Sequence, residues 1–146
     1  MRLISSRSPD RDVTNTVDVT SALAVFDAIE TLLTPRFPDL PFPKLKRAFV
    51  DFDRLYRGDF PGFHACDTEY HDTQHVLDVT LAAARLIDGY EASAPAEPLG
   101  SRLAMVGVLV ALFHDAGYIR RKGDSRHTNG AEYTRVHVSR SARFLV

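Results

Sequence analysis

The sequence is poor in cysteine, in net charge and in long apolar runs, and each scarcity excludes a class of protein. Cys66 is the only cysteine among 146 residues, so the chain cannot form an internal disulfide. A formal net charge of -1 and a pI near 6.6 provide no overall basic field for nucleic acid or an acidic membrane. The longest apolar run, residues 103–113, is too short to cross a bilayer, and residues 1–12 lack the apolar core of a signal peptide. We therefore expect a cytoplasmic protein that neither spans a membrane nor binds nucleic acid.

The apolar content is sufficient for one globular domain. Hydrophobic residues make up 45% of the chain and charged residues 25%, a balance that allows a buried core. Residues 1–17 are rich in Ser, Arg, Asp and Thr without apolar periodicity, which predicts a flexible N-terminal arm. We place the domain at residues 18–146. Because no stop signal follows its last predicted helix, we expect the domain to be incomplete at its C-terminal end.

Apolar residues repeat at helical spacing without β-alternation, which predicts an all-α bundle of about five helices. Thr20 or Ser21 can cap the first helix, Gly58 is placed to end the second, and Leu86 belongs to the predicted core face of the third. The fourth is predicted to be buried in the core. The predicted helices cover residues 18–34, 44–57, 72–90, 103–113 and a last segment from about residue 128 onward.

The apolar segment 103–113 ends on the adjacent pair His114 and Asp115. Burying an imidazole and a carboxylate costs free energy unless these groups are paired, hydrogen-bonded or bound to a cation. Imidazole nitrogen and carboxylate oxygen suit Zn, Fe, Mn or Co, and carboxylate with water also suits Mg. The sequence therefore predicts a divalent metal ion at this helix end.

A second part of the predicted site lies upstream, in the segment YHDTQH of residues 70–75. Its histidines, His71 and His75, are four residues apart, a spacing that places them on one face of a helix. Three imidazoles and one carboxylate are then available to one centre. We expect the side chains of His75, His114 and Asp115 to converge, because ligands of one ion lie within a few ångströms of each other.

His75, the pair His114 and Asp115, and the Gly117 that follows resemble the H…HD…D pattern of HD-domain metal-dependent phosphohydrolases. The stretch YHDTQHVLDV (residues 70–79) is similar to the YHNxxHAxDV segment of cyclic-nucleotide phosphodiesterases. HD domains are helical bundles, so the resemblance implies an HD-domain-like version of the all-α fold predicted above.

The resemblance also implies roles for individual residues. His75, His114 and Asp115 correspond to metal ligands, and His71 matches the histidine that protonates the leaving oxygen, a task suited to a group that titrates near pH 7. A divalent ion would activate water and neutralise charge on a phosphoryl oxygen. The implied activity is hydrolysis of a phosphoester in a small, nucleotide-like phosphorylated substrate.

The sequence departs from the resembled pattern in two ways. Asp72 stands where the phosphodiesterases have Asn, and the last Asp of the pattern is missing up to Val146. Asp124 and Glu132, the only carboxylates after Asp115, do not lie where that ligand belongs. With one ligand fewer, we expect weak metal binding and slow hydrolysis.

Several further residues are candidates for the site. His127, in the segment HTNGAE, resembles a histidine that helps to hold a second metal in some bacterial members, although its spacing is one residue shorter. Arg120, Arg121 and Lys122 can contact a substrate phosphate, and the alternative is an ordinary solvated loop. We assign His137 to the surface.

Two other classes of function remain compatible with the sequence. One is a non-catalytic signalling or scaffold domain that keeps the helical bundle, which the missing Asp favours. The other is a zinc peptidase, because HDTQH has the H-x-x-x-H spacing of a metalloprotease helix, but Asp72 replaces the expected Glu. If the apolar face of the last predicted helix is exposed, it would favour self-association, so the sequence is also compatible with a homo-oligomer.

Overall fold

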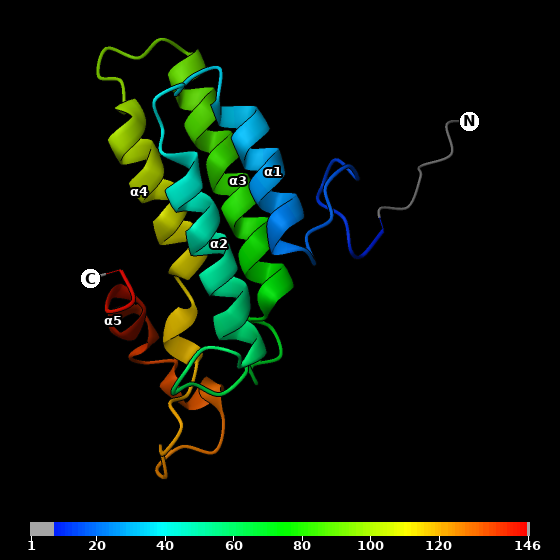
Figure 1. Cartoon of the computed structure of the whole chain (residues 1–146), viewed down its shortest axis with the longest axis vertical. Coiled ribbons are helices and arrows are strands. Elements are labelled where there is room, and N and C mark those ends of the chain that lie inside the picture. The colour runs from blue at the N-terminus through cyan, green and yellow to red at the C-terminus, as the bar shows by residue number, and fades with distance from the viewer. Residues whose placement is uncertain (1–7, 146) are drawn as a thin grey trace.

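The computed structural model describes residues 8–145 and confirms the all-α class (Figure 1). Five α-helices and two short 3-10 helices, η1 and η2, make up the described chain, which contains no β-strand. The elements are α1 (Ala22–Leu33), α2 (Phe42–Arg57), α3 (Thr73–Ala92), α4 (Gly100–Phe113), η1 (Ala116–Tyr118), η2 (Gly130–Tyr133) and α5 (His137–Ala142).

The four long helices form an up-down-up-down bundle (Figure 1). α1 packs against α2 and α3, and α4 packs against α2 and α3, so the four helices enclose one core. This topology brings the N-terminal end of α3 and the C-terminal ends of α2 and α4 to the same end of the bundle, where η1, η2 and α5 also lie. Over residues 8–145, no helix combines the length and the apolar character needed to span a membrane.

Helix ends follow local sequence signals. Ser21 caps α1 by accepting a hydrogen bond from the backbone N–H of Ala24 at 3.2 Å. α2 begins two residues before the predicted start because Pro43, in its first turn, needs no hydrogen-bond partner there. Gly58 ends α2 in the left-handed region, with φ of 81°, and a Cβ at this position would lie 2.7 Å from the backbone nitrogen of Ala65.

The core is rich in aromatic side chains, but the predicted burial of the fourth helix is wrong in part. Phe26 and Phe49 meet edge to face with ring centroids 5.8 Å apart. In α4, one face is buried, whereas Val106 and Val110 on the other face are 47% and 49% exposed. Leu86, predicted to be core, is 75% exposed. An apolar residue type indicates burial only when another element covers its side of the helix.

The segment predicted as one last helix from residue 128 is divided in two. η2 ends at Tyr133, the backbone turns, and α5 runs only from His137 to Ala142. α5 buries the polar Ser141 against η1. Val136 and Leu145 are 47% and 42% exposed, so most of the predicted apolar face does not enter the core.

Part of the predicted N-terminal arm is folded into a turn around Asp12. Residues 1–7 lie outside the described part of the chain, whereas the Asp12 carboxylate is fully buried. It accepts hydrogen bonds from the backbone N–H groups of Thr14, Thr16 and Val17, and it pairs with Arg85 of α3 at 2.7 Å. Burial opposes ionisation, but the Thr14 hydroxyl, which also donates to this carboxylate, and the other donors outweigh it and hold the pKa of Asp12 far below its usual range.

Asp12→Asn is expected to destabilise the chain by roughly 3 kcal/mol, because the buried network loses its charge and Arg85 loses its partner. Urea denaturation at pH 7 measures this free energy of unfolding. Because the folded-state pKa is lowered, the stabilisation by Asp12 is complete above about pH 4 and is lost as the pH falls further. The difference between Asp12→Asn and the parent chain should therefore shrink in acid. Asp10→Asn, at an exposed neighbour, is the control, and an equal loss there would contradict the assignment.

Candidate metal centre

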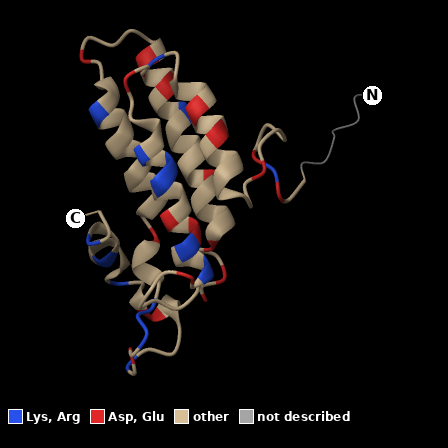
Figure 2. Cartoon of the chain, viewed as in Figure 1, with Lys and Arg blue, Asp and Glu red and all other residues tan. Residues whose placement is uncertain are grey.

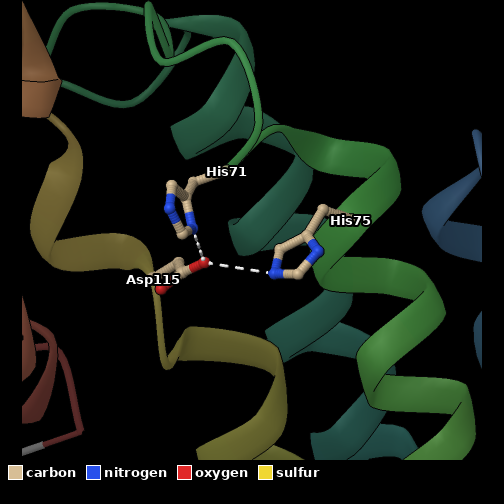
Figure 3. Close-up of side chains that lie close together, drawn as sticks. All are labelled: His71, His75 and Asp115. Atoms are coloured by element: carbon tan, nitrogen blue, oxygen red, sulfur yellow. Dashed lines mark hydrogen bonds and ion pairs between the residues drawn. The ribbon is translucent and has the colours of Figure 1, made fainter.

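Asp115 lies at the junction between α4 and η1, where the chain turns away from the end of the helix. Its side chain is only 3% exposed, so the carboxylate has lost most of its water and depends on protein groups for partners. Figure 3 shows this carboxylate pointing towards His71, which lies in the loop before α3, and towards His75, which lies in the first turn of α3. The bundle topology therefore determines which groups can meet Asp115.

Four histidines approach the oxygens of Asp115. His71 Nδ1 is 2.7 Å from Oδ2, His114 Nε2 is 3.2 Å and His75 Nε2 is 3.5 Å from the same oxygen, and His137 Nε2 is 3.9 Å from Oδ1. The three side chains expected from the sequence to converge do lie together. Two further histidines join them, one assigned to proton transfer and one to the surface.

His71, His75 and Asp115 form a group that can hold a metal ion. Each of these residues offers one ligand atom, and the three atoms lie within 4.8 Å of one another. Donors of one ion must each lie about 2 Å from it, so a separation of this size needs little rearrangement. His71, assigned from the sequence as a proton donor, is therefore also placed where a ligand would lie.

The tautomers of His114 and His137 can be inferred from their backbone contacts. Nδ1 of His114 is 2.7 Å from the carbonyl oxygen of Ala111, and Nδ1 of His137 is 2.7 Å from that of Thr134. A carbonyl only accepts, so both Nδ1 atoms carry protons, and in the neutral ring Nε2 presents a lone pair. In both residues this Nε2 faces Asp115, an arrangement that is repulsive unless a proton or a cation lies between the two atoms.

Only one of the two upstream histidines lies on a helix, contrary to the predicted shared helical face. α3 begins at Thr73 because Asp72 caps it, accepting a hydrogen bond from the backbone N–H of His75 at 2.9 Å. His71 precedes this cap and reaches Asp115 from the loop. The rings of His71 and His75 nevertheless meet, with centroids 5.5 Å apart.

The electrostatics of the cluster favour a carboxylate anion. Burial opposes ionisation of Asp115, but hydrogen bonds from His114 and His71 outweigh it and lower its pKa to about 2. The contact with Asp115 raises the pKa of His114 above its usual value, whereas burial lowers that of His75. Asp115 is therefore ionised and His75 neutral near pH 7, the states in which these groups bind metals.

α5 is attached to η1 by polar contacts that leave little space between them. The backbone N–H of Gly117 donates to Ser141 Oγ at 2.8 Å, and this hydroxyl donates to the carbonyl of His114 at 2.6 Å. Arg140 donates to the carbonyls of Gly117 and Ile119 at 2.6 and 2.9 Å. These bonds satisfy the carbonyl of His114 at the end of α4 and two further carbonyls in and just after η1, none of which has a helical partner there.

Gly117 makes this approach possible, and the approach brings His137 to the site. A Cβ at Gly117 would overlap the carbonyl oxygen of His137 and lie 2.8 Å from the backbone nitrogen of Ser141. The Tyr118 ring stacks with both His71 and His137, with centroid distances of 4.5 and 4.4 Å. The surface assignment of His137 is therefore wrong, and Gly117 was the only sequence signal that another segment comes close here.

The other predicted site residues stabilise the loop between η1 and α5. His127 Nδ1 contacts Asp124 Oδ2 at 2.9 Å, and the Tyr133 hydroxyl donates to the same oxygen. Arg120 pairs with Asp67 at 2.9 Å and donates to the carbonyl of His127 at 3.3 Å. His127 thus belongs to a separate cluster, and the charge of Arg120 is already paired.

The remaining charged residues of this loop also contact neighbours other than Asp115. Glu132 accepts hydrogen bonds from Thr128 and Asn129 at the start of η2, so its carboxylate serves as a cap. Arg121 lies over the ring of Phe63, and Lys122 is exposed. Neither carboxylate that follows Asp115 in the sequence replaces the missing ligand, and among the described residues the group that can hold a metal consists of His71, His75 and Asp115 alone. The predicted ligand His114 and the additional histidine His137 contact Asp115 from outside this group.

A cavity of about 470 Å³ opens beside the cluster. Of the histidines that approach Asp115, only His71 lines it, together with Tyr118. The rest of its wall comes mostly from residues with polar side chains, namely Asp67, Thr68, Glu69, Tyr70, Asn129 and Thr134, together with Ala131. A ligand in this cavity would therefore meet the cluster through His71.

Neither a family model, nor a curated protein, nor a solved structure matches this chain. The function of the chain is consequently inferred from the chemistry of the cluster and from the resemblance of its motifs.

Divalent cations are expected to bind at this cluster with release of protons, because a cation must replace the proton that Asp115 favours on His114. Calorimetric titration with Zn or Mn in two buffers of different ionisation enthalpy measures the released protons. Affinity should rise between about pH 5.5 and 8, where histidines lose their protons. Asp115→Asn should abolish binding, and Asp27→Asn on α1 should leave it unchanged. Binding that does not depend on pH and is unchanged in Asp115→Asn would contradict a metal centre at this cluster.

Gly117→Ala is expected to separate α5 from η1, because the added methyl group overlaps the backbone of α5. We expect a loss of about 2 to 4 kcal/mol in the free energy of unfolding, as is typical of overpacking at a backbone contact. NMR of the histidine rings should show His137 losing its contact with Tyr118. Gly89→Ala, at a helical glycine with open space around its Cβ position, is the matched control. Unchanged stability and ring signals in Gly117→Ala would exclude the proposed constraint.

Proposed function

We propose that this chain is an HD-type phosphohydrolase that binds a divalent cation between α3, α4 and α5. The observation that carries the proposal is the buried Asp115 carboxylate, faced by four imidazoles, two of which have their Nδ1 protons directed to backbone carbonyls. Metal-binding histidines usually donate their second nitrogen in this way. A structural ion pair would need only one of these rings.

The donor set is consistent with the predicted ions. Imidazole nitrogen and carboxylate oxygen suit Zn, Fe, Mn or Co. The set contains no thiolate, since the Cys66 sulfur contacts the Thr68 hydroxyl and the backbone carbonyl of His71. When bound, such an ion supplies hydroxide near neutral pH and offsets negative charge on a phosphoryl oxygen. Asp115 contributes the negative charge that attracts the cation, and the histidines supply neutral donors.

His71 is suited to protonate the leaving group. Its Nδ1 is bound to Asp115, which orients the ring, and the residue also lines the polar cavity. A ring with Nδ1 held by a carboxylate can carry and release a proton at Nε2. As the cluster member that faces the cavity, His71 is the group best placed to transfer a proton to a leaving oxygen there.

The cavity is sized for a small phosphorylated molecule such as a nucleotide, but its wall offers no Lys or Arg. Asp67 and Glu69 line it, and Arg120 is paired with Asp67 at its edge. The phosphoryl charge would therefore be neutralised at the cluster alone. We expect slow turnover for this reason, since phosphoryl transfer depends on electrostatic stabilisation.

The same acidic wall is the observation that favours the second candidate, a non-catalytic domain whose cluster holds a cation without hydrolysis. Peptidase activity finds less support. Asp72, the residue in the position of the peptidase base, caps α3 with its carboxylate. His71 and His75 also lack the common helix that the peptidase motif requires.

His71→Ala is expected to lower the hydrolysis of an alkyl phosphoester by about 10² to 10⁴, the usual contribution of general acid catalysis. The effect on an activated aryl phosphate should be much smaller, because its leaving group needs no proton. Phosphate release is measured with Mn added and again after addition of a chelator, alongside metal content. His64→Ala, a histidine outside the cluster, is the control.

The possible results separate the candidate functions. Loss of metal in His71→Ala would make this residue a ligand, and equal effects on both substrates would remove its role as an acid. A parent chain that binds metal at Asp115 but releases no phosphate from either substrate would support the non-catalytic domain.

A further inference from the structure

A second cavity, of about 430 Å³, shares no lining residue with the histidine cluster and combines charged with aromatic side chains. Three arginines and three phenylalanines form its wall: Phe60, Phe63, Arg121, Arg140, Arg143 and Phe144. We propose that this cavity and the apolar groove next to it bind a free single-chain amphiphile with an anionic headgroup. The arginines would hold the headgroup, and the groove would hold the apolar chain.

The arginines are available to an anion. Among the described residues, none of the three is paired with a carboxylate, and no acidic residue lines the cavity. Arg140 donates hydrogen bonds to the carbonyls of Gly117 and Ile119. These bonds fix the position of its guanidinium group, and because carbonyls are uncharged they leave its positive charge unpaired. A guanidinium next to a carboxylate or phosphate forms charge-assisted hydrogen bonds.

Local backbone pairing explains why arginine and phenylalanine meet here. Phe63 and Arg121 form an isolated antiparallel bridge, supported by hydrogen bonds from His64 N to Arg120 O at 2.9 Å and from Lys122 N to Gly62 O at 2.8 Å. Arg121 consequently lies over the Phe63 ring, 5.5 Å from its centroid. This pairing limits the motion of one arginine, which reduces the entropic cost of binding.

The charge around this cavity differs from that of the chain as a whole. The net charge is -1, yet Figure 2 shows α5 with Lys and Arg colouring and without Asp or Glu. The cavity beside the histidine cluster, by contrast, is lined by Asp67 and Glu69. Apart from a cation held at the histidine cluster, the arginine cavity therefore attracts anions more strongly than the cavity beside the cluster.

An apolar groove of about 300 Å³ continues from the arginine cavity, because Phe60 and Phe144 line both. Leu55, Leu109 and Phe113 contribute most of its remaining apolar wall. The one acidic residue of the groove, Asp51, is 3.7 Å from Arg54. A ligand that fills both spaces must carry its charge at one end and an extended apolar body at the other.

This shape distinguishes the amphiphile from other anions. Inorganic phosphate would leave the groove empty, and an uncharged chain would leave the three arginines without an anionic partner. A long chain buries apolar area, each CH₂ contributing to affinity through the hydrophobic effect. Charge and chain should therefore act together in binding.

Calorimetric titration of the full chain with decanoate and with decyl phosphate, both below their micelle concentrations, tests the proposal. Decanol, acetate and inorganic phosphate serve as matched probes that carry only one half of the ligand. We expect decanoate or decyl phosphate to bind at least about tenfold more tightly than any of the three, and the stronger of the two identifies the headgroup. Equal binding of decanol or of inorganic phosphate would overturn the proposal.

Single substitutions locate the site. Arg121→Gln and Arg143→Gln should each weaken amphiphile binding about tenfold, and Leu145→Ser, at the end of the groove, should weaken it several-fold. Arg102→Gln, which removes one positive charge from exposed α4, should not change it. Equal weakening by Arg102→Gln would indicate nonspecific charge attraction, and tighter binding to anionic vesicles than to free amphiphile would indicate a membrane surface. A dimer that excludes the amphiphile would assign the groove to a second copy. Each of these three results would refute the proposal.

Discussion

The buried carboxylate of Asp115 is the constraint on which this end of the molecule depends. An ionised carboxyl group with a 3% exposed side chain is stable only if donors or a cation replace its water. The protein meets this requirement with imidazoles from three helices or their flanking loops rather than with Lys or Arg. Because imidazoles can release their protons near pH 7, the same arrangement can exchange protons for a metal ion. Asp115 and the histidines around it therefore matter both for the stability of the fold and for the proposed metal binding.

The connection between η1 and α5 extends this constraint to the last part of the chain. Ser141 and Arg140 satisfy carbonyls at the end of α4 and in η1, and Gly117 leaves room for the backbone of α5. The contact holds His137 near Asp115, and Arg140, which makes part of the contact, also lines the second cavity. The docking of α5 thus contributes to both candidate binding sites. The order of α5 depends on this polar contact because most of its apolar side chains do not enter the core.

The two cavities differ in the chemistry that they offer. The one beside the cluster is polar and partly acidic, and it depends on the cluster to attract a phosphate. The other combines arginine with aromatic and aliphatic side chains, and it suits an anion attached to an apolar body. The net charge of -1 does not reveal this difference, because it sums the positive charges around one cavity and the negative charges around the other.

The sequence by itself determined the features that depend on near neighbours in the chain. Helical spacing of apolar residues predicted the bundle, Ser21 and Gly58 marked helix ends, and the HD pair indicated a buried polar site. Tertiary structure decided what depends on distant contacts: that one face of α4 stays exposed, that Arg120 pairs with Asp67, and that His137 joins Asp115. Periodicity specifies which face of a helix is apolar but not which element covers it. A histidine's role is determined by the groups that the fold brings to it, and the sequence spacing between His114 and His137 carries no such information.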